Sequence, residues 1–415
     1  MVVSWQYNTN GLSNMTNPKR ALVATHHLMD YAGSEIATLE LASELRQSGW
    51  KVQIASFQIG EPMSLVFKKR GFEILDLIDD IPLILATHYD LVWIHHAPVY
   101  YQLCLANKIN ARKIIHSCLS PFEPLEMAPI ENEQIDWILA NSQETKQVIK
   151  STIGAGDDRV LVFPNTVPIE FWGYAKNSHP KIPKQVAIVS NHPPIEVLQA
   201  GQKLADNGIL VTHIGRGGVY ELVTPELLLK FDILITIGKT VLYCFALRIP
   251  VYCYDHFGGP GWLTPKNLNI SAEYNFSGRG FSKKSPETIF HELLYGYDNS
   301  LHNIEALALK AKEKYNLYTN LQELLNKLQK KRIKTCLNKN LNAISLQHNY
   351  YVRLLKTVKA FHEENVALHE EIANLHREIA ALGREITRVK STISWKITKP
   401  LRFFANVILG RWKKS

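Results

Sequence analysis

The residue types that bind phosphate groups gather in one stretch of the chain, residues 235–261 (ITIGKTVLYCFALRIPVYCYDHFGGPG). Gly238, Lys239 and Thr240 directly follow an apolar run, as at the end of an ATP-binding P-loop. That motif requires a glycine five positions before Gly238, where the chain has Ile233, so a P-loop is excluded. The lysine still lies between a predicted strand and an apolar helix, where it could neutralise a phosphate.

Polar loops follow four consecutive strands predicted in this half of the chain. Because the carboxyl ends of parallel strands meet at one sheet edge, we expect these loops to converge on one cleft. Arg216 and Lys239 could hold a diphosphate there, with helix N-termini adding N–H donors. A single basic residue after a strand is usually part of a solvated loop, so the convergence is what favours a site. The other candidates are Ser190, Asn191, His192, Gly215, Gly217, Gly238, Thr240, Asp255, Gly258 and Gly259.

Polar groups also lie at strand ends in the first half of the chain. Gly33, with Ser34 and Glu35 after it, lies at a strand-to-helix junction, where a helix N-terminus could bind a polar ligand. An ordinary tight turn is the alternative. Three histidines at strand ends could bind hydroxyls or act as acids and bases, or could be buried and bonded to carbonyls; further metal ligands are not evident. These are His95, His96 and His116.

The elements that must position these residues form two similar series. With 415 residues, 46% of them apolar, the chain can fold into two cored domains. Short apolar runs alternate with helical stretches, which predicts doubly wound α/β domains with parallel sheets. The expected parts are a disordered N-terminus (1–19), domains over 20–173 and 185–300, a helical segment packed on them (301–353), a coiled coil (354–393) and a tail (394–415).

The predicted coiled coil rests on a seven-residue repeat. Isoleucine at position a and leucine at position d favour a parallel two-stranded coiled coil, and therefore a homodimer, while Asn365 at an a position could fix the register. A packed monomeric helix is the alternative. The repeat positions are Phe361, Leu368, Leu375, Leu382 and Val389 in one series, and Ile372, Ile379, Ile386 and Ile393 in the other.

The tail 394–415 is basic and apolar, and no acidic residue follows Glu385. Its apolar segment of about a dozen residues is too short to cross a bilayer but suits an anchor on an anionic membrane surface. A helix buried in an oligomer is the alternative. Because the charge is local, we expect no nucleic acid partner. The first twenty residues lack the apolar core of a secretory signal, so we expect a cytoplasmic protein at the inner face of the membrane.

Several segments resemble one family in the same order along the chain. RIPVYCYDHFGGPG is similar to a strand and glycine loop of GT-B glycosyltransferases of the GT4-like superfamily. ANSQETKQVI with VFPNTVPIEFW resembles the end of their N-terminal domain, and GSEIATLELASELRQSGWKV resembles their acceptor-side loop and first helix. The coiled coil with SWKITKPLR is similar to tails of bacterial polysaccharide-assembly enzymes. The resemblance covers about 20–330 and 355–412.

The resemblance implies a GT-B glycosyltransferase that makes bacterial surface polysaccharide of the O-antigen type. Its donor, a nucleotide-diphosphate sugar carrying a hexose or deoxyhexose, would bind the C-terminal domain, and a lipid-linked glycan acceptor the N-terminal one. Such enzymes commonly retain anomeric configuration, need no metal or cofactor, and stabilise the leaving diphosphate with cations. By position, Lys239 and Arg216 correspond to diphosphate contacts, and His116 to a histidine at the donor sugar.

The chain departs from that family at its Glu-x7-Glu pair. Tyr243 stands where the second glutamate would hold the ribose, the first position is not acidic, and Arg248 replaces the usual glycine. Tyr243 and Asp255 are then the nearest groups for hydroxyl contacts. The loss leaves two alternatives open: a catalytically silent GT-B scaffold or binding subunit, and a nucleotide-sugar epimerase or hydrolase.

Overall fold

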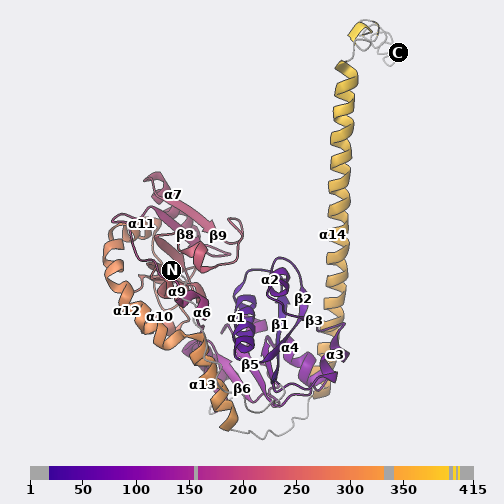
Figure 1. The fold of residues 1–415 in the computed structure, drawn as a ribbon, viewed down its shortest axis with the longest axis vertical. Helices are drawn as coiled ribbons and strands as arrows, with labels where there is room; N and C mark the ends of the chain where they lie inside the picture. The colour runs from indigo at the N-terminus through magenta and orange to yellow at the C-terminus, as the bar shows by residue number, and fades with distance from the viewer. Residues whose placement is uncertain (1–17, 154–157, 331–340, 392–395, 399–400, 402–415) are drawn as a thin grey trace. The chain divides into compact units, whose positions relative to one another are not determined.

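The computed structural model describes residues 18–153, 158–330, 341–391, 396–398 and 401 (Figure 1). It forms two units, Met1–Tyr350 and Tyr351–Ser415, and each is considered by itself. The predicted membrane-binding tail 394–415 therefore lies almost entirely outside the described residues, as does nearly all of the segment 1–19.

The first domain is built on a seven-stranded parallel sheet in the order β3-β2-β1-β4-β5-β6-β7. Strands β4 and β5 are buried along their whole length, as expected when both faces of a parallel sheet are covered. The strand order changes direction between β1 and β4, where doubly wound sheets bind ligands. The strands are β1 (Arg20–Leu28), β2 (Lys51–Ile59), β3 (Ile74–Asp76), β4 (Leu91–His95), β5 (Ile114–Cys118), β6 (Trp137–Ala140) and β7 (Val160–Val162).

Helices connect these strands, and the first of them is the longest in the domain. Helix α1 packs Leu39, Ala42 and Leu45 into a core that also holds Val23 of β1 and Ile54 of β2. The helices are α1 (Gly33–Gln47), α2 (Met63–Lys69), α3 (Ile81–Ala86), α4 (Ala97–Tyr100), α5 (Gln143–Ile153) and α6 (Ile169–Trp172), with a π-helix at Tyr101–Ala106 and a 3-10 turn at Pro124–Glu126.

The second domain has a five-stranded sheet in the order β12-β11-β10-β8-β9, parallel except for β12. Helix α9 lies in its core, since every residue from Val241 to Leu247 is buried. The strands are β8 (Gln185–Val189), β9 (Leu210–Ile214), β10 (Ile233–Thr236), β11 (Val251–Asp255) and β12 (Gly258–Trp262), and the helices are α7 (Ile195–Asp206), α8 (Pro225–Leu228), α9 (Lys239–Leu247), α10 (Leu268–Glu273) and α11 (Pro286–Tyr295).

Two further helices join the domains. Helix α12 (Tyr297–Tyr315) contributes Leu307 and Ala311 to the core of the second domain, while α13 (Leu317–Lys330) contributes Leu321 and Leu324 to that of the first. At their junction, Val167 exchanges backbone hydrogen bonds with residues 315 and 317. The predicted fold, two Rossmann-like domains followed by a C-terminal helix, is confirmed.

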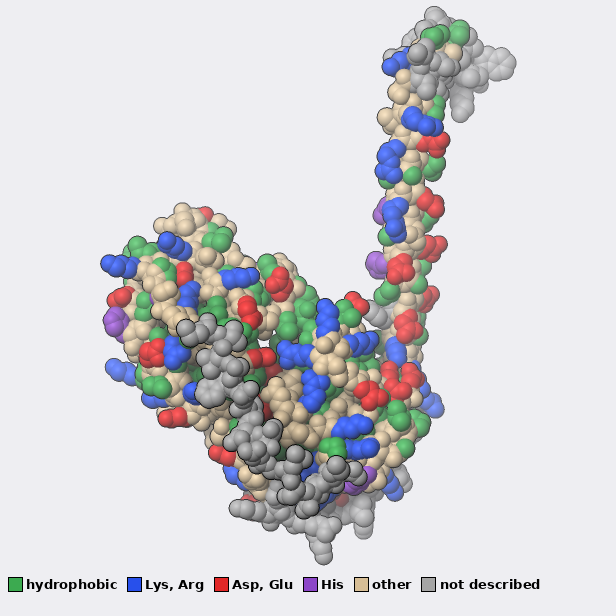
Figure 2. All heavy atoms as spheres, viewed as in Figure 1, with side chains coloured by type: hydrophobic (Ala, Val, Ile, Leu, Met, Phe, Trp, Pro, Cys, Tyr) green, Lys and Arg blue, Asp and Glu red, His purple; other side chains and the backbone are tan. Residues whose placement is uncertain are grey.

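The last described element is the single helix α14 (Leu341–Ser391). Figure 2 shows apolar side chains along it between charged ones. The described repeat positions from Phe361 to Val389 have 43–64% of their surface exposed. The helix agrees with the sequence pattern, and its pairing with a second copy stays a prediction. Within the described residues, no helix is long and apolar enough to span a membrane.

Candidate active site

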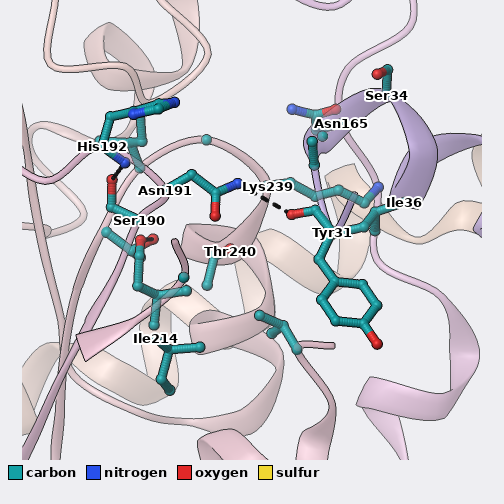
Figure 3. A pocket seen from close by; sticks show the side chains of 18 of the residues that line it. Tyr31, Ser34, Ile36, Asn165, Ser190, Asn191, His192, Ile214, Lys239 and Thr240 are labelled. Atoms are coloured by element: carbon teal, nitrogen blue, oxygen red, sulfur yellow. Dashed lines mark hydrogen bonds between the residues drawn. The ribbon is translucent and has the colours of Figure 1, made fainter. Parts of the chain in front are cut away.

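A cavity of about 480 Å³ lies between the two domains, and Figure 3 shows it from close by. It lies at the carboxyl-terminal edges of both parallel sheets, next to the points where their strand orders change direction. Cofactors and small substrates usually bind at such points in α/β proteins, in cavities of this size. The cavity is therefore the strongest candidate for a substrate-binding site.

The second domain forms one wall of the cavity from the loops after four parallel strands. Those loops follow β8, β9, β10 and β11, so the structure brings together most of the residues that we expected to converge. Asn191 spans the gap to the first domain, because its side-chain amide donates to the carbonyl of Tyr31 at 3.3 Å (Figure 3). The predicted residues that line this wall are Ser190, Asn191, His192, Gly215, Gly238, Lys239, Thr240, Tyr243 and Asp255.

At two positions in this wall the backbone has a positive φ, which favours glycine. Gly215 has φ +137°, and a Cβ at this position would overlap the carbonyl of Ser190. Gly238 has φ +60° and directly precedes α9. Helix α9 therefore begins at the cavity with Lys239 and Thr240, whose backbone N–H groups have no acceptor within a helix at this position. This is a suitable arrangement for binding an anion.

Lys239 does not extend freely into the cavity. Its ammonium forms an ion pair with Glu40 of α1 and donates to the carbonyl of Thr166 at 3.0 Å. The hydroxyl of Tyr243 also donates to Glu40, so this tyrosine is engaged at the contact between α9 and α1. Burial raises the pKa of Glu40, while Lys239 and Tyr243 act to lower it. The lysine therefore stands beside the cavity, held by a carboxylate of the opposite domain.

Arg216 is held in a similar way beside the cavity: it follows the lining residue Gly215 but is not itself among the lining residues. Its guanidinium forms an ion pair with Asp30, which also accepts a 2.8 Å hydrogen bond from the hydroxyl of Tyr220. A third pair joins Arg279 to Glu144 at 2.6 Å. In all three pairs the cation comes from the second domain and the carboxylate from the first. An anionic ligand at the rim would compete with Asp30 for Arg216.

Other predicted residues lie outside the cavity wall, as far as the described residues show. Gly258 and Gly259 belong to β12 rather than to a loop, and a Cβ on either would overlap backbone atoms. Gly217 lies in the turn after β9, beside Arg216, and is not among the lining residues either. On the first domain, Gly33 and Ser34 line the cavity, whereas Glu35 is fully buried behind them and accepts from the Ser34 hydroxyl at 2.8 Å.

The predicted histidines form a buried group behind the first-domain wall. His116 lies in the middle of β5 and is fully buried, and burial lowers its pKa to about 3. His95 is also buried, at the edge of a second, smaller cavity, and burial holds its pKa well below the ordinary value. His96 follows it with the unusual φ of +80° and is 1% exposed. None of these imidazoles lines the main cavity.

The cavity also contains residues that the sequence patterns did not single out. Glu126 follows β5 in an irregular loop, for which no periodic signal exists. Glu40 is not a lining residue of this cavity; it lies on α1 and lines the second, smaller cavity, although a polar residue of a helix is normally expected to face solvent. The additional lining residues that carry polar side chains are Tyr31, Glu126, Asn141, Asn165, Tyr220, Glu221, Thr236, His256 and Asn275.

Solved structures with this fold include several glycosyltransferases. A glycosyltransferase from Rickettsia africae is 14% identical, with a TM-score of 0.54 over 76% of this chain and 100% of that chain. S. aureus TarM, solved as a variant with fondaparinux, α-GlcNAc-glycerol and UDP, is 12% identical, with a TM-score of 0.51 over 75% of this chain and 99% of that one. No protein-family model and no curated protein matches the sequence. At these identities the likeness shows the GT-B fold.

Proposed function

We propose that this protein is a glycosyltransferase that takes a nucleotide-diphosphate sugar in the interdomain cavity and transfers the sugar to a glycan. The observation that carries the proposal is the second-domain wall of that cavity. There, four loops after parallel strands, two glycines with positive φ and the start of α9 meet. Such a wall offers N–H donors and close backbone approach, which are what a diphosphate requires. The complex of TarM with UDP, which has the same fold, supports this choice.

The glutamate that holds the ribose in the resembling family is absent from this chain, and two carboxylates of the cavity are candidates to replace it. The hydroxyl of Tyr243 is bonded to Glu40, so we do not assign the ribose to it. Glu221 follows β9 and lines the cavity, as does Asp255 at the end of β11. Either carboxylate can accept hydrogen bonds from a ribose. A nucleotide-sugar site can therefore be proposed here without the glutamate pair.

We expect calorimetric titration with UDP-, GDP- and dTDP-sugars to find one nucleotide that binds. Arg216→Ala should weaken that binding about tenfold or more, because it removes a charge-assisted contact to phosphate. Asp30→Asn should strengthen it, since Arg216 is then released from its carboxylate. Arg248→Ala is the matched control, because Arg248 pairs with Glu305 and, unlike Arg216, is not next to any residue that lines the cavity. Wild-type protein that binds none of the three nucleotides would refute the proposal.

The long helix α14 supports a second part of the proposal, a parallel dimer. Its exposed repeat positions would be covered by the same positions of a second copy. We expect the full chain to sediment as a dimer. Leu375→Asp with Leu382→Asp should give a monomer, whereas Arg384→Asp, on the polar side of the same repeat, should leave the dimer intact. A monomeric wild-type chain would rule this part out.

The finer features of the function rest on the sequence alone. They are the lipid-linked acceptor, the surface polysaccharide product, retention of configuration, independence from metal, the membrane contact of 394–415 and the cytoplasmic location. Each stays a prediction.

A further inference from the structure

Glu126 holds a distinct position in the cavity. It ends the 3-10 turn Pro124–Glu126 after β5 and lines the first-domain wall, with 20% of its side chain exposed. Among the described residues, it is the one carboxylate that this domain contributes to the lining. The wall with the proposed diphosphate site belongs to the other domain. A carboxylate in this place can face the acceptor side of a bound donor.

His96 stands directly behind Glu126. Its Nδ1 accepts the backbone N–H of His26 at 3.1 Å and lies 3.2 Å from the hydroxyl of Thr25. Because a backbone N–H can only donate, Nδ1 must be the acceptor, and the proton of the neutral ring lies on Nε2. Nε2 is 3.8 Å from the Oε1 of Glu126 and has no hydrogen-bond partner within the described part of the chain. A small approach would make it a donor to the carboxylate.

Strain and burial support a fixed role for His96. It is 1% exposed and has φ +80°, a conformation that non-glycine residues adopt at a cost and that clusters at functional sites. Two residues of the neighbouring strand β1 hold the ring through its Nδ1: the hydroxyl of Thr25 and the backbone N–H of His26. The ring is therefore fixed before any ligand binds, and its Nε2–H is directed to one carboxylate.

We propose that Glu126 is the base that accepts the proton of the acceptor hydroxyl, and that His96 positions it. This inference rests on the proposed glycosyl transfer. The hydroxyl oxygen forms a bond to the anomeric carbon of the donor sugar while the bond from that carbon to the diphosphate oxygen breaks. The diphosphate leaves with the electron pair, and the hydroxyl proton passes to the Glu126 carboxylate.

The test uses the full chain and the nucleotide-sugar that it binds, with water as the acceptor and release of nucleoside diphosphate as the readout. Glu126→Gln should keep the dissociation constant of the nucleotide and lower the release rate about 100-fold or more. Sodium formate should restore part of the rate in Glu126→Ala, because it supplies a carboxylate in the vacated space. Glu123→Gln is the control, since Glu123 is exposed in the same loop and does not line the cavity.

A second pair of variants tests the role of His96. His96→Gln can keep an N–H near the position of Nε2 and should retain more of the rate than His96→Leu, with equal nucleotide affinity. Release at the wild-type rate by Glu126→Gln would overturn the inference. So would loss of nucleotide binding in that variant, which would make Glu126 a donor ligand. If wild-type protein binds no nucleotide, the proposed function fails and this inference fails with it.

Discussion

Replacing Glu40 with alanine is expected to lower the free energy of unfolding by about 3–5 kcal/mol, because it leaves the ammonium of Lys239 buried without its carboxylate. The side chains of this pair are 6% and 11% exposed, so the ammonium stays largely shielded from bulk water when its carboxylate is removed. The hydroxyl of Tyr243 loses its acceptor as well. Urea unfolding followed by tryptophan fluorescence measures the change.

Two further variants identify the cause of this effect. Glu305→Ala removes a carboxylate from the exposed pair with Arg248 and should cost about 1 kcal/mol or less. The double variant Glu40→Leu with Lys239→Met replaces the buried pair by apolar groups and should recover most of the stability. If Glu40→Ala is no more destabilising than Glu305→Ala, the pair does not join the domains as described.

Acidification below pH 6.5 is expected to destabilise the protein steeply. Burial lowers the pKa of His26 and His116 to about 3 and that of His95 well below its ordinary value. These histidines stay neutral in the folded chain while the unfolded chain takes up protons, so stability is complete above pH 6.5 and falls as the pH drops toward 3. Three such groups cost at most about 4 kcal/mol per pH unit. The raised pKa of Glu40 has the opposite effect on stability, because its carboxyl group binds at most one more proton in the folded chain than in the unfolded chain.

Urea midpoints at pH 7, 6 and 5 test this dependence. His95 is the most informative position, because neither of its ring nitrogens has a hydrogen-bond partner among the described residues. His95→Phe should therefore reduce the slope by about a third without loss of stability at pH 7. His302→Gln, at an exposed position of α12, should leave the slope unchanged. Equal midpoints at pH 7 and pH 5 in the wild type would contradict the buried neutral state of these histidines.

The fold could be predicted from sequence because each domain repeats one simple pattern. Apolar strands such as LVWIH (residues 91–95) alternate with amphipathic helices, and their parallel arrangement places strand-end loops at one edge. The same reasoning located Gly215, which directly follows β9, and Gly238, which lies two residues after the end of β10. The glycines at 258 and 259 looked like part of that series, but the chain pairs them as an antiparallel strand.

The partners of the candidate site could not be predicted, because they depend on contacts between distant parts of the chain. Lys239 and Glu40 are separated by about two hundred residues, and nothing in the pattern of α1 indicates that Glu40 faces another domain. His116 was expected at a strand end. Strand β5 continues for two residues beyond it, which places the side chain inside the protein. Glu126 lies in a loop whose sequence has no hydrophobic periodicity, so no sequence pattern indicates where its side chain lies.

The most direct test of the central claim is a crystal structure of the full chain with the nucleoside diphosphate that binds most tightly. We expect the diphosphate at the start of α9, within hydrogen-bonding distance of the backbone N–H groups of Lys239 and Thr240, with Gly215 close to it. A nucleotide bound at any other place on the molecule, with the interdomain cavity unchanged, would contradict the proposed donor site.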